Sequence, residues 1–347
     1  MSQKIKFGTD GWRAIIAEEF TFDNVKMVTK AIAAYIRSNY DISKPVVIGY
    51  DTRFMADKFA MTAAEVLKNL GFRVLFSKSY APTPVIAYAA KQEETAGALM
   101  FTASHNPPEY LGIKYIPDYA GPATTDITDT IVKNVEKIQN GGEVISILQT
   151  SGKIEEFDPK PAYKEHIKTL IDFDKIRQLK TKILFDPLYG ASLGYFDEIL
   201  KENGCEVELV HNWTDPLFGG GMPEPKPKYL KELIEKVKSD SNTIGFSNDG
   251  DSDRFGVIDE LGNYVTPNEI IAILLKHLIK NKNRKGSLVK TVAGSLLLNK
   301  IAEKYGNMPV YETPVGFKWV GEIMRTDEVI VGGEESGGLS IWGHIPE

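Results

Sequence analysis

PVVIGYDTR, residues 45–53, sets the pattern on which the rest of the chain is built. It is a short run rich in β-branched residues that ends in polar side chains. A helical pattern through AAEVLKNL, a glycine at position 71 and a second apolar run, FRVLF, follow it. A glycine just after the last periodic residue is a common helix stop. The segment therefore predicts a β-α-β unit, in which a helix joins two parallel strands and covers the sheet.

The same order of signals occurs twice more along the chain. KILFDPLYG (182–190) precedes YFDEILKEN, Gly204 and CEVELV, and SLVKTVAGS (287–295) precedes LLLNKIAEKY, Gly306 and NMPVYE. Three such units predict an α/β protein of three consecutive, related α/β/α domains with mixed, largely parallel sheets. We place these domains at residues 1–150, 155–260 and 261–347, with the Gly-, Pro- and polar-rich stretch 141–161 joining the first two.

Length and composition limit the class of protein. The 347 residues suffice for two or three domains at roughly 100–200 residues each. No run of 18 apolar residues or apolar leader occurs, so we expect a cytoplasmic protein that neither spans nor binds a membrane. The net charge of −6 argues against nucleic acid as a partner, and the single Cys205 excludes a disulfide scaffold and a Cys-rich zinc site.

The first segment that can carry chemistry is FTASHNPPEYLGIKYI, residues 101–116. It follows the apolar run AGALMF, and ligands of open α/β sheets bind just beyond the carboxyl ends of strands. Ser104 beside His105 suits a nucleophile with an acid/base partner, and the ammonium of Lys114 can meet an anion. The alternative is a plain Ser/Asn/Pro turn between strands.

The second segment is TIGFSNDGDSDRFGVID, residues 243–259, in which Asp249, Asp251 and Asp253 alternate between two apolar runs. Three carboxylates this close repel one another unless a cation holds them, and oxygen ligands select Mg²⁺, Ca²⁺ or Mn²⁺. The three aspartates also match the first, third and fifth positions of an EF-hand loop. That loop requires a glycine at its sixth position, where this sequence has Arg254, and its flanks are helical whereas these are strand-like, so an EF-hand is disfavoured. A solvated turn is the remaining alternative.

Two shorter segments complete the set. VGGEESGGLS (331–340) offers the acceptors Glu334, Glu335 and Ser336 between glycines, which suits neutral polyols such as sugars but also a flexible turn. FGTDGWR (7–13) suggests a tight turn at Asp10 and Gly11 before Arg13, which can clamp a phosphate bidentately or can be a surface residue.

In the order TDGWR, TASHNPP with GIK, DGDSDR and GEESGG, these segments resemble the α-D-phosphohexomutase family over essentially the whole chain. The resemblance implies an intramolecular phosphotransferase that interconverts hexose 1-phosphate and hexose 6-phosphate through a phosphoserine and a bisphosphorylated sugar. It implies that Ser104 carries the transferable phosphoryl group. It further implies that Asp249, Asp251 and Asp253 bind Mg²⁺, with a phosphoserine oxygen on Ser104 completing the metal site.

The resemblance also assigns the remaining site residues. It implies that Arg13, His105 and Lys114 are catalytic residues that position the phosphate and move protons. The implied substrate-binding residues are Arg254, Lys290, Thr313, Gly316, Glu334 and Ser336. The implied substrates are small hexose phosphates, with glucose favoured and mannose possible, and hexose 1,6-bisphosphate is the implied activator and intermediate.

The sequence departs from the family in two ways. It has no Arg/Ser/Gly/Thr-rich phosphate-binding loop of the family's fourth domain. It also ends at GHIPE (343–347), where the family's third domain continues. We therefore expect a truncated third domain and an absent C-terminal phosphate-binding domain. Two alternatives stay open, a non-catalytic fragment that binds sugar phosphate and Mg²⁺, and a Mg²⁺-dependent serine phosphatase.

Overall fold

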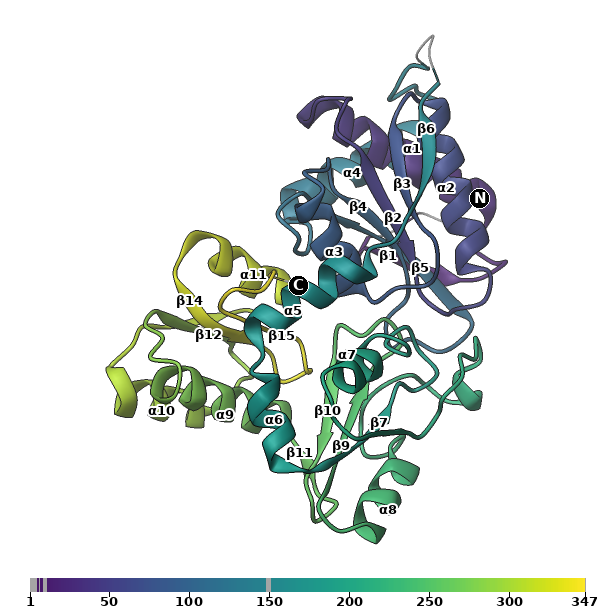
Figure 1. The fold of residues 1–347 in the computed structure, drawn as a ribbon. Coiled ribbons are helices and arrows are strands. Elements are labelled where there is room, and N and C mark those ends of the chain that lie inside the picture. Colours follow the sequence, from purple (N-terminus) through teal and green to yellow (C-terminus); the bar gives the residue numbers. More distant parts are fainter. Residues whose placement is uncertain (1–4, 6, 9–10, 148–150, 347) are drawn as a thin grey trace. The chain divides into compact units, whose positions relative to one another are not determined.

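The computed structural model describes residues 5, 7–8, 11–147 and 151–346. The chain forms two compact units, which are described separately: Met1–Tyr163 with Asp215–Met222, and Lys164–Thr214 with Pro223–Glu347. Figure 1 shows the elements of both units along the chain. Among the described residues, no helix is long and apolar enough to cross a membrane.

The first unit is built on a six-stranded mixed sheet with the order β1-β5-β4-β2-β3-β6. Its strands are β1 (Trp12–Ile15), β2 (Val46–Tyr50), β3 (Arg73–Ser77), β4 (Ala98–Phe101), β5 (Tyr110–Ile116) and β6 (Lys153–Phe157). Strand β5 runs antiparallel to β1 and β4, whereas β4, β2, β3 and β6 are mutually parallel. The polar residues that follow β4 therefore lie at the boundary between the parallel and antiparallel parts of the sheet.

Helices cover both faces of this sheet. Helix α1 (Phe22–Asn39) packs against α2 (Ala56–Asn69) and α4 (Thr125–Gln139), and Ile48 of β2 lies in the core beneath them. The next residue, Gly49, faces α3 (Thr83–Gln92), because a Cβ there would lie 2.3 Å from a side-chain carbon of Ile86. Since neighbouring residues of a strand face opposite sides, α3 covers the other face.

The second unit contains two sheets, of which the first has the order β11-β10-β9-β7-β8. Its strands are β7 (Lys182–Asp186), β8 (Val207–Leu209), β9 (Thr243–Asn248), β10 (Phe255–Ile258) and β11 (Tyr264–Val265). Helix α8 (Lys231–Ser239) packs over Leu184 of β7, and α7 (Phe196–Glu202) over the neighbouring Ile183. These helices therefore cover opposite faces of the sheet, which gives a second α/β/α sandwich.

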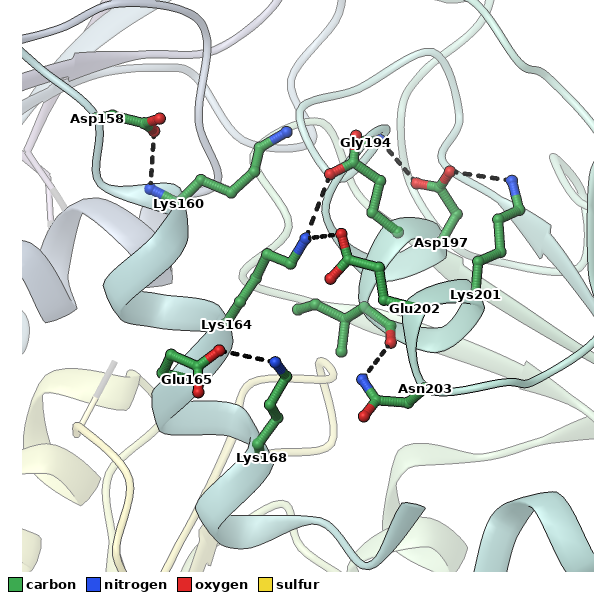
Figure 2. A network of polar contacts seen from close by, with 12 residues as sticks. Asp158, Lys160, Lys164, Glu165, Lys168, Gly194, Asp197, Lys201, Glu202 and Asn203 are labelled. Carbon is green, nitrogen blue, oxygen red and sulfur yellow. Dashed lines mark hydrogen bonds and ion pairs between the residues drawn. The ribbon is translucent and has the colours of Figure 1, made fainter. Parts of the chain in front are cut away.

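Helices α5 (Lys160–Leu170) and α6 (Phe173–Leu179) lead into this sheet. From Lys164 onward α5 belongs to the second unit, and the Lys164 ammonium forms ion pairs with Glu198, at 3.6 Å, and with Glu202, both on α7. Figure 2 shows this network, in which Lys201 and the backbone N–H of Gly194 also bind the Asp197 carboxylate. These contacts join α5 to α7 through polar side chains.

The other sheet of the second unit has the order β13-β12-β14-β15. Its strands are β12 (Ser287–Thr291), β13 (Val310–Thr313), β14 (Val329–Gly333) and β15 (Leu339–Ile341). Helices α9 (Pro267–Lys280) and α10 (Leu296–Gly306) pack on one face, over Leu288 and Val331. Helix α11 (Phe317–Thr326) packs over Val289 on the other face.

The three sheets share one strand order. In each, the first strand of the repeat lies between the second and the third, and an antiparallel strand follows the third: β5-β4-β2-β3, β10-β9-β7-β8 and β15-β14-β12-β13. The prediction of three related α/β/α domains with mixed, largely parallel sheets is therefore confirmed.

One segment of the expected connection is part of a sheet. Residues Lys153–Phe157 form β6, which pairs with β3, and the Arg73 guanidinium lies 2.7 Å from the Glu155 carboxylate across the pair. Ile154 packs against the core, whereas Lys153 is exposed. The sequence of an edge strand with charged side chains resembles that of a linker, because only one face of the strand is apolar. The exact domain boundaries stay a prediction.

Candidate active site

Three loops occupy equivalent places in the three sheets. The loop with Ser104 and His105 joins β4 to β5, the loop with the three aspartates joins β9 to β10, and the loop with Glu334 and Ser336 joins β14 to β15. Each therefore follows the third strand of its repeat and precedes the antiparallel strand. The common topology places each set of polar side chains at the carboxyl end of a parallel strand, where open sheets bind ligands.

Ser104 lies at a strained point of the first loop. Its φ is 50°, in the left-handed region, and its backbone N–H donates to Thr102 Oγ1 at 2.8 Å. Its Oγ lies 3.3 Å from Nδ1 of His105, as expected for a hydroxyl with an acid/base neighbour. Backbone strain of this kind in a non-glycine residue is concentrated at functional sites.

The two predicted cations Arg13 and Lys114 lie on neighbouring strands of the first sheet. Arg13 on β1 pairs with Gly112 of β5, and Lys114 is two residues further along β5, so both lie on one face of the sheet. Arg13 donates to the Asn106 side-chain oxygen at 2.8 Å, and Lys114 is buried. Arg13 therefore contacts the loop that holds Ser104 and His105, and Lys114 lies on the same face of the sheet as Arg13.

Gly11 is required for the close contact between the N-terminal segment and the backbone of β5. Its φ is 92°, and a Cβ there would lie 2.3 Å from the Ile113 carbonyl oxygen. Only glycine can combine this conformation with such close backbone contact. Asp10, which the sequence places in the same tight turn, lies outside the described residues.

The sequence did not predict the role of Arg53. This residue is buried, and it binds the backbone of the Ser104 loop. Its guanidinium donates hydrogen bonds to four carbonyl oxygens of the loop, those of Ser104 and Asn106 at 2.7 Å, Pro107 at 2.8 Å and Tyr110 at 3.0 Å. Its Nε lies 3.3 Å from Asp51 Oδ2. The signal was present in YDTR after the first predicted strand, but nothing in the sequence indicated which loop the arginine would meet.

The second loop gathers three carboxylates. One oxygen from each of Asp249, Asp251 and Asp253 lies within 4.8 Å of the others, and the first two residues are buried. The loop closes on itself, since the Arg254 N–H donates to Asp249 Oδ1 at 3.0 Å. Three carboxylates so close together fit a hard divalent cation such as Mg²⁺, whose charge offsets their mutual repulsion.

A turn that was not singled out from the sequence supports this metal loop. Gly190, after β7, lies so close to it that a Cβ would be 2.7 Å from the Gly250 carbonyl oxygen, and the Ala191 N–H donates to that oxygen at 2.9 Å. The turn begins at the buried Asp186, whose Oδ1 accepts the Leu188 N–H and lies 2.9 Å from His211 Nδ1. The His211 ring stacks on Tyr189.

The electrostatics of His211 follow from these neighbours. Burial lowers the pKa of its imidazole, but the hydrogen bond and negative charge of Asp186 outweigh burial, and Glu232 adds to them. The pKa of His211 is therefore raised above its ordinary value, so the protonated imidazole is favoured in the folded protein.

In the third loop, Glu334 organises its neighbours. This residue is 6% exposed; its Oε1 accepts the Gly316 N–H at 2.7 Å and its Oε2 accepts the Ser336 hydroxyl at 3.0 Å. Burial raises the pKa of its carboxyl, although the two hydrogen bonds oppose that effect. Glu334, Ser336 and Gly316, which the sequence grouped as substrate-binding, thus form one cluster.

The remaining predicted residues lie at the same end of the third sheet. Lys290 is buried in β12 and donates to Glu312 Oε2 at 2.7 Å, and Thr313 ends the neighbouring strand β13. Arg254 borders the Glu334 loop, because a Cβ on Gly337 would lie 3.6 Å from the Arg254 Cβ. The metal loop and the Glu334 loop of the second unit therefore adjoin.

Two further carboxylates lie in this region of the third sheet. Glu335 accepts a hydrogen bond from the Thr291 hydroxyl at 2.6 Å, and Glu312 pairs with Lys290. The sequence indicated Glu335 as an acceptor within the GEESGG motif, whereas it did not predict Glu312, because its partner Lys290 comes from a neighbouring strand.

Comparison with known proteins agrees with this geometry. Models of phosphoglucomutase/phosphomannomutase α/β/α domains I, II and III match residues 4–142, 161–262 and 266–347. A phosphoglucomutase of Komagataeibacter xylinus is 30% identical over 98% of this chain, which spans 65% of that protein. A phosphoglucosamine mutase of Clostridium botulinum (strain Loch Maree / Type A3) is 32% identical over 95% of this chain and 72% of its own length.

A solved structure shows the same fold. The crystal structure of a putative phosphomannomutase from Thermus thermophilus superposes with a TM-score of 0.90 at 33% identity, and the match covers 100% of this chain and 77% of the other. Motifs, three-fold topology and these similarities agree. The chain therefore belongs to the α-D-phosphohexomutase family of phosphoglucomutases and phosphomannomutases.

Proposed function

We propose that this chain provides the phosphoryl-transfer machinery of a phosphohexomutase, which interconverts hexose 1-phosphate and hexose 6-phosphate. The observation that carries the proposal is the equivalent placement of three different loops, one with a nucleophile, one with a carboxylate triad and one with sugar-type acceptors. A fold that repeats one strand order three times, with a different polar loop in each repeat, matches the needs of a reaction with a phosphate, a metal and a sugar.

In the proposed reaction, phosphorylated Ser104 donates its phosphoryl group to a sugar hydroxyl. The bond between Ser104 Oγ and phosphorus breaks, a bond between the sugar oxygen and phosphorus forms, and the hydroxyl proton passes to a base, for which His105 and Lys114 are the candidates. The resulting hexose 1,6-bisphosphate then returns its other phosphoryl group to Ser104. No net oxidation or hydrolysis occurs.

The other charged residues of the first unit have a supporting role in this proposal. Arg13 would bind phosphoryl oxygens with its planar fork, and Lys114 would offset negative charge that develops during transfer. Mg²⁺ bound by Asp249, Asp251 and Asp253 would supply a Lewis acid for the phosphoryl group.

The residues of the third sheet would recognise the sugar. Glu334 and Ser336 offer acceptors for hydroxyl groups, Lys290 and Arg254 offer positive charge for a phosphate, and Thr313 and Gly316 line the same end of the sheet. We propose glucose phosphate as the favoured substrate and mannose phosphate as a second one. The relative named phosphoglucosamine mutase makes glucosamine phosphate the third sugar to compare.

The test follows the phosphoryl group. The full chain is incubated with glucose 1,6-bisphosphate and Mg²⁺, and intact-mass measurement with peptide mapping locates the modification. We expect one phosphoryl group on Ser104, none there in Ser104→Ala, and an unchanged result in Ser151→Ala, which alters an exposed serine of the same unit. Equal phosphorylation of wild type and Ser104→Ala would refute Ser104 as the acceptor.

Two further outcomes separate the alternatives. Steady release of inorganic phosphate without conversion between glucose 1-phosphate and glucose 6-phosphate would indicate a serine phosphatase. Binding of hexose phosphate without any transfer to Ser104 would indicate a non-catalytic binding fragment. Transfer from the phosphorylated chain to glucose, mannose and glucosamine 1-phosphates then ranks the substrates.

A further inference from the structure

A short turn from a distant part of the chain packs with the Ser104 unit. Asp215–Met222 lies between β8 and α8 in the sequence, yet it belongs to the first compact unit. Its sequence, DPLFGGGM, contains three consecutive glycines. Residues 215–222 form a defined turn in which Phe218 is the only buried side chain.

The turn holds Phe218 in an unfavourable backbone conformation. The φ of Phe218 is 50°, followed by 63° at Gly219 and 79° at Gly220, and glycines tolerate this left-handed region whereas phenylalanine does not. The Asp215 carboxylate stabilises the turn by accepting the N–H groups of Leu217 at 2.9 Å and Gly219 at 3.0 Å. Strain kept at one aromatic residue beside available glycines points to a role for its side chain.

That side chain covers Arg53. The Phe218 ring centroid lies 4.9 Å from the Arg53 guanidinium carbon, and Phe218 is 4% exposed whereas the neighbouring Leu217 is 61% exposed. A guanidinium over an aromatic face is stabilised by the ring's quadrupole, most strongly when water is excluded. Arg53 thus has the ring on one side, Asp51 at its Nε and the Ser104 loop at its other nitrogens.

We propose that Phe218 and Arg53 are a positioning pair for the Ser104 loop. Arg53 turns the carbonyl groups of Ser104, Asn106, Pro107 and Tyr110 toward itself, and Phe218 fixes the plane of the guanidinium that does so. With those carbonyl dipoles directed at a buried cation, the backbone around Ser104 adopts one geometry. The value of this geometry for phosphoryl transfer rests on the proposed function, but the positioning itself does not.

Neither residue needs to touch the substrate for this role. Reacting atoms must be aligned within a fraction of an ångström, and a small displacement from a distant substitution can cost a large factor in rate. The pair therefore acts through the loop backbone. Lysine cannot replace Arg53 here, because its point charge lacks the planar fork that reaches several carbonyl groups at once.

The first experiment measures hydrogen exchange of the loop amides without any substrate. We compare wild type with Phe218→Leu, which keeps an apolar residue under the same backbone strain but removes the aromatic face, and with Arg53→Lys. Phe218→Tyr keeps the aromatic face, and Leu217→Ala alters the exposed neighbour in the same turn. We expect at least tenfold faster exchange for peptides covering residues 102–111 in Phe218→Leu and Arg53→Lys, and near wild-type exchange in the other two.

Two results would overturn the proposal. One is exchange in residues 102–111 of Phe218→Leu that equals that of Leu217→Ala. The other is faster exchange spread evenly over the first unit, which would mean that Phe218 only contributes to general packing. Thermal unfolding of each variant shows whether a fold remains to be measured, and Arg53→Lys keeps the test decisive if Phe218→Leu unfolds.

The second experiment connects the pair to transfer. The rate of Ser104 phosphorylation by glucose 1,6-bisphosphate is measured over a range of bisphosphate concentrations. We expect at least a tenfold lower maximal rate in Phe218→Leu with a nearly unchanged half-saturating concentration, and recovery in Phe218→Tyr. If wild type itself is not phosphorylated, the proposed function fails, while the exchange measurement still decides whether the pair positions the loop.

Discussion

At the scale of single residues, the metal loop depends on one backbone contact that leaves no room for a side chain. Gly190 approaches Gly250 so closely that a Cβ would be 2.7 Å from its carbonyl oxygen, 2.9 Å from its Cα and 3.1 Å from the Asp249 carbonyl oxygen. All three atoms are backbone, so no rotamer change can relieve the clash. Either the turn or the metal loop must move when a methyl group is added.

We therefore expect Gly190→Ala to weaken Mg²⁺ binding at least tenfold, measured by calorimetric titration of the full chain. Overpacking of this kind also costs about 1–3 kcal/mol in the free energy of unfolding. The control is Gly141→Ala, where φ is 78° and nothing lies within 4 Å of the added Cβ. That change costs about 1–2 kcal/mol through its left-handed backbone conformation alone. Equal Mg²⁺ affinities in the two variants would contradict the prediction.

Single-residue signals differ in how far the sequence reveals them. Ser104, Asp249 and Glu334 were visible because polar side chains next to apolar runs indicate loops at strand ends. The roles of Arg53 and Phe218 were not visible, because the packing of the guanidinium on the ring joins positions far apart in the chain. A single sequence contains no information on which distant loop a buried cation will meet.

At the scale of elements, the first two repeats share a further device. Each ends its first strand near a buried aspartate whose Oδ1 accepts the N–H two residues later: Asp51 from Arg53 at 2.9 Å, and Asp186 from Leu188 at 2.8 Å. Each aspartate also pairs with a basic side chain, Arg53 or His211. Each resulting turn supports the polar loop of its own repeat. The sequence showed both aspartates at strand ends, but not that they shape the turns.

The His211–Asp186 pair predicts a pH-dependent stability. The folded-state pKa of His211 is raised, so its contribution is fully present below the unfolded pKa of about 6.5 and is lost as pH rises through the folded-state pKa. Glu232 favours the charged imidazole and Lys236 opposes it. We expect the free energy of unfolding of wild type to fall over this window relative to that of His211→Gln, measured by urea denaturation.

The histidine on α9 provides the control for this measurement. His277 is exposed and lies 2.9 Å from Asn281 Nδ2, without a carboxylate among its hydrogen-bond partners in the described structure. His277→Gln is the matched His-to-Gln substitution at an exposed position. Replacement of His211 by leucine should cost about 3 kcal/mol, because it leaves the Asp186 carboxylate buried without its partner. Parallel profiles for wild type and His211→Gln would contradict the assignment.

At the scale of the whole molecule, periodicity predicted the repeated architecture and its order of elements. The repeats can be predicted from the sequence because the helices of each repeat pack on strands of the same repeat. The apolar periodicity that directs this packing is local in the sequence. The two exceptions are segments whose placement depends on distant partners. Strand β6 joins an edge beside β3, and Asp215–Met222 packs with the first unit because Phe218 reaches Arg53.

The division into two compact units yields the last prediction, which concerns Mg²⁺. The carboxylate triad lies wholly in the second unit, so a cation bound there stabilises that unit by mass action, by about 2.7 kcal/mol at a Mg²⁺ concentration roughly 100 times its Kd. We expect Mg²⁺ to slow hydrogen exchange in β7, β9 and β10 while exchange in β2 and β4 stays unchanged. Asp251→Asn, which removes one buried charge from the triad, should abolish most of this protection, and KCl at equal ionic strength should not reproduce it. Equal protection of both units would mean that they unfold together, and protection that persists in Asp251→Asn would place the cation elsewhere.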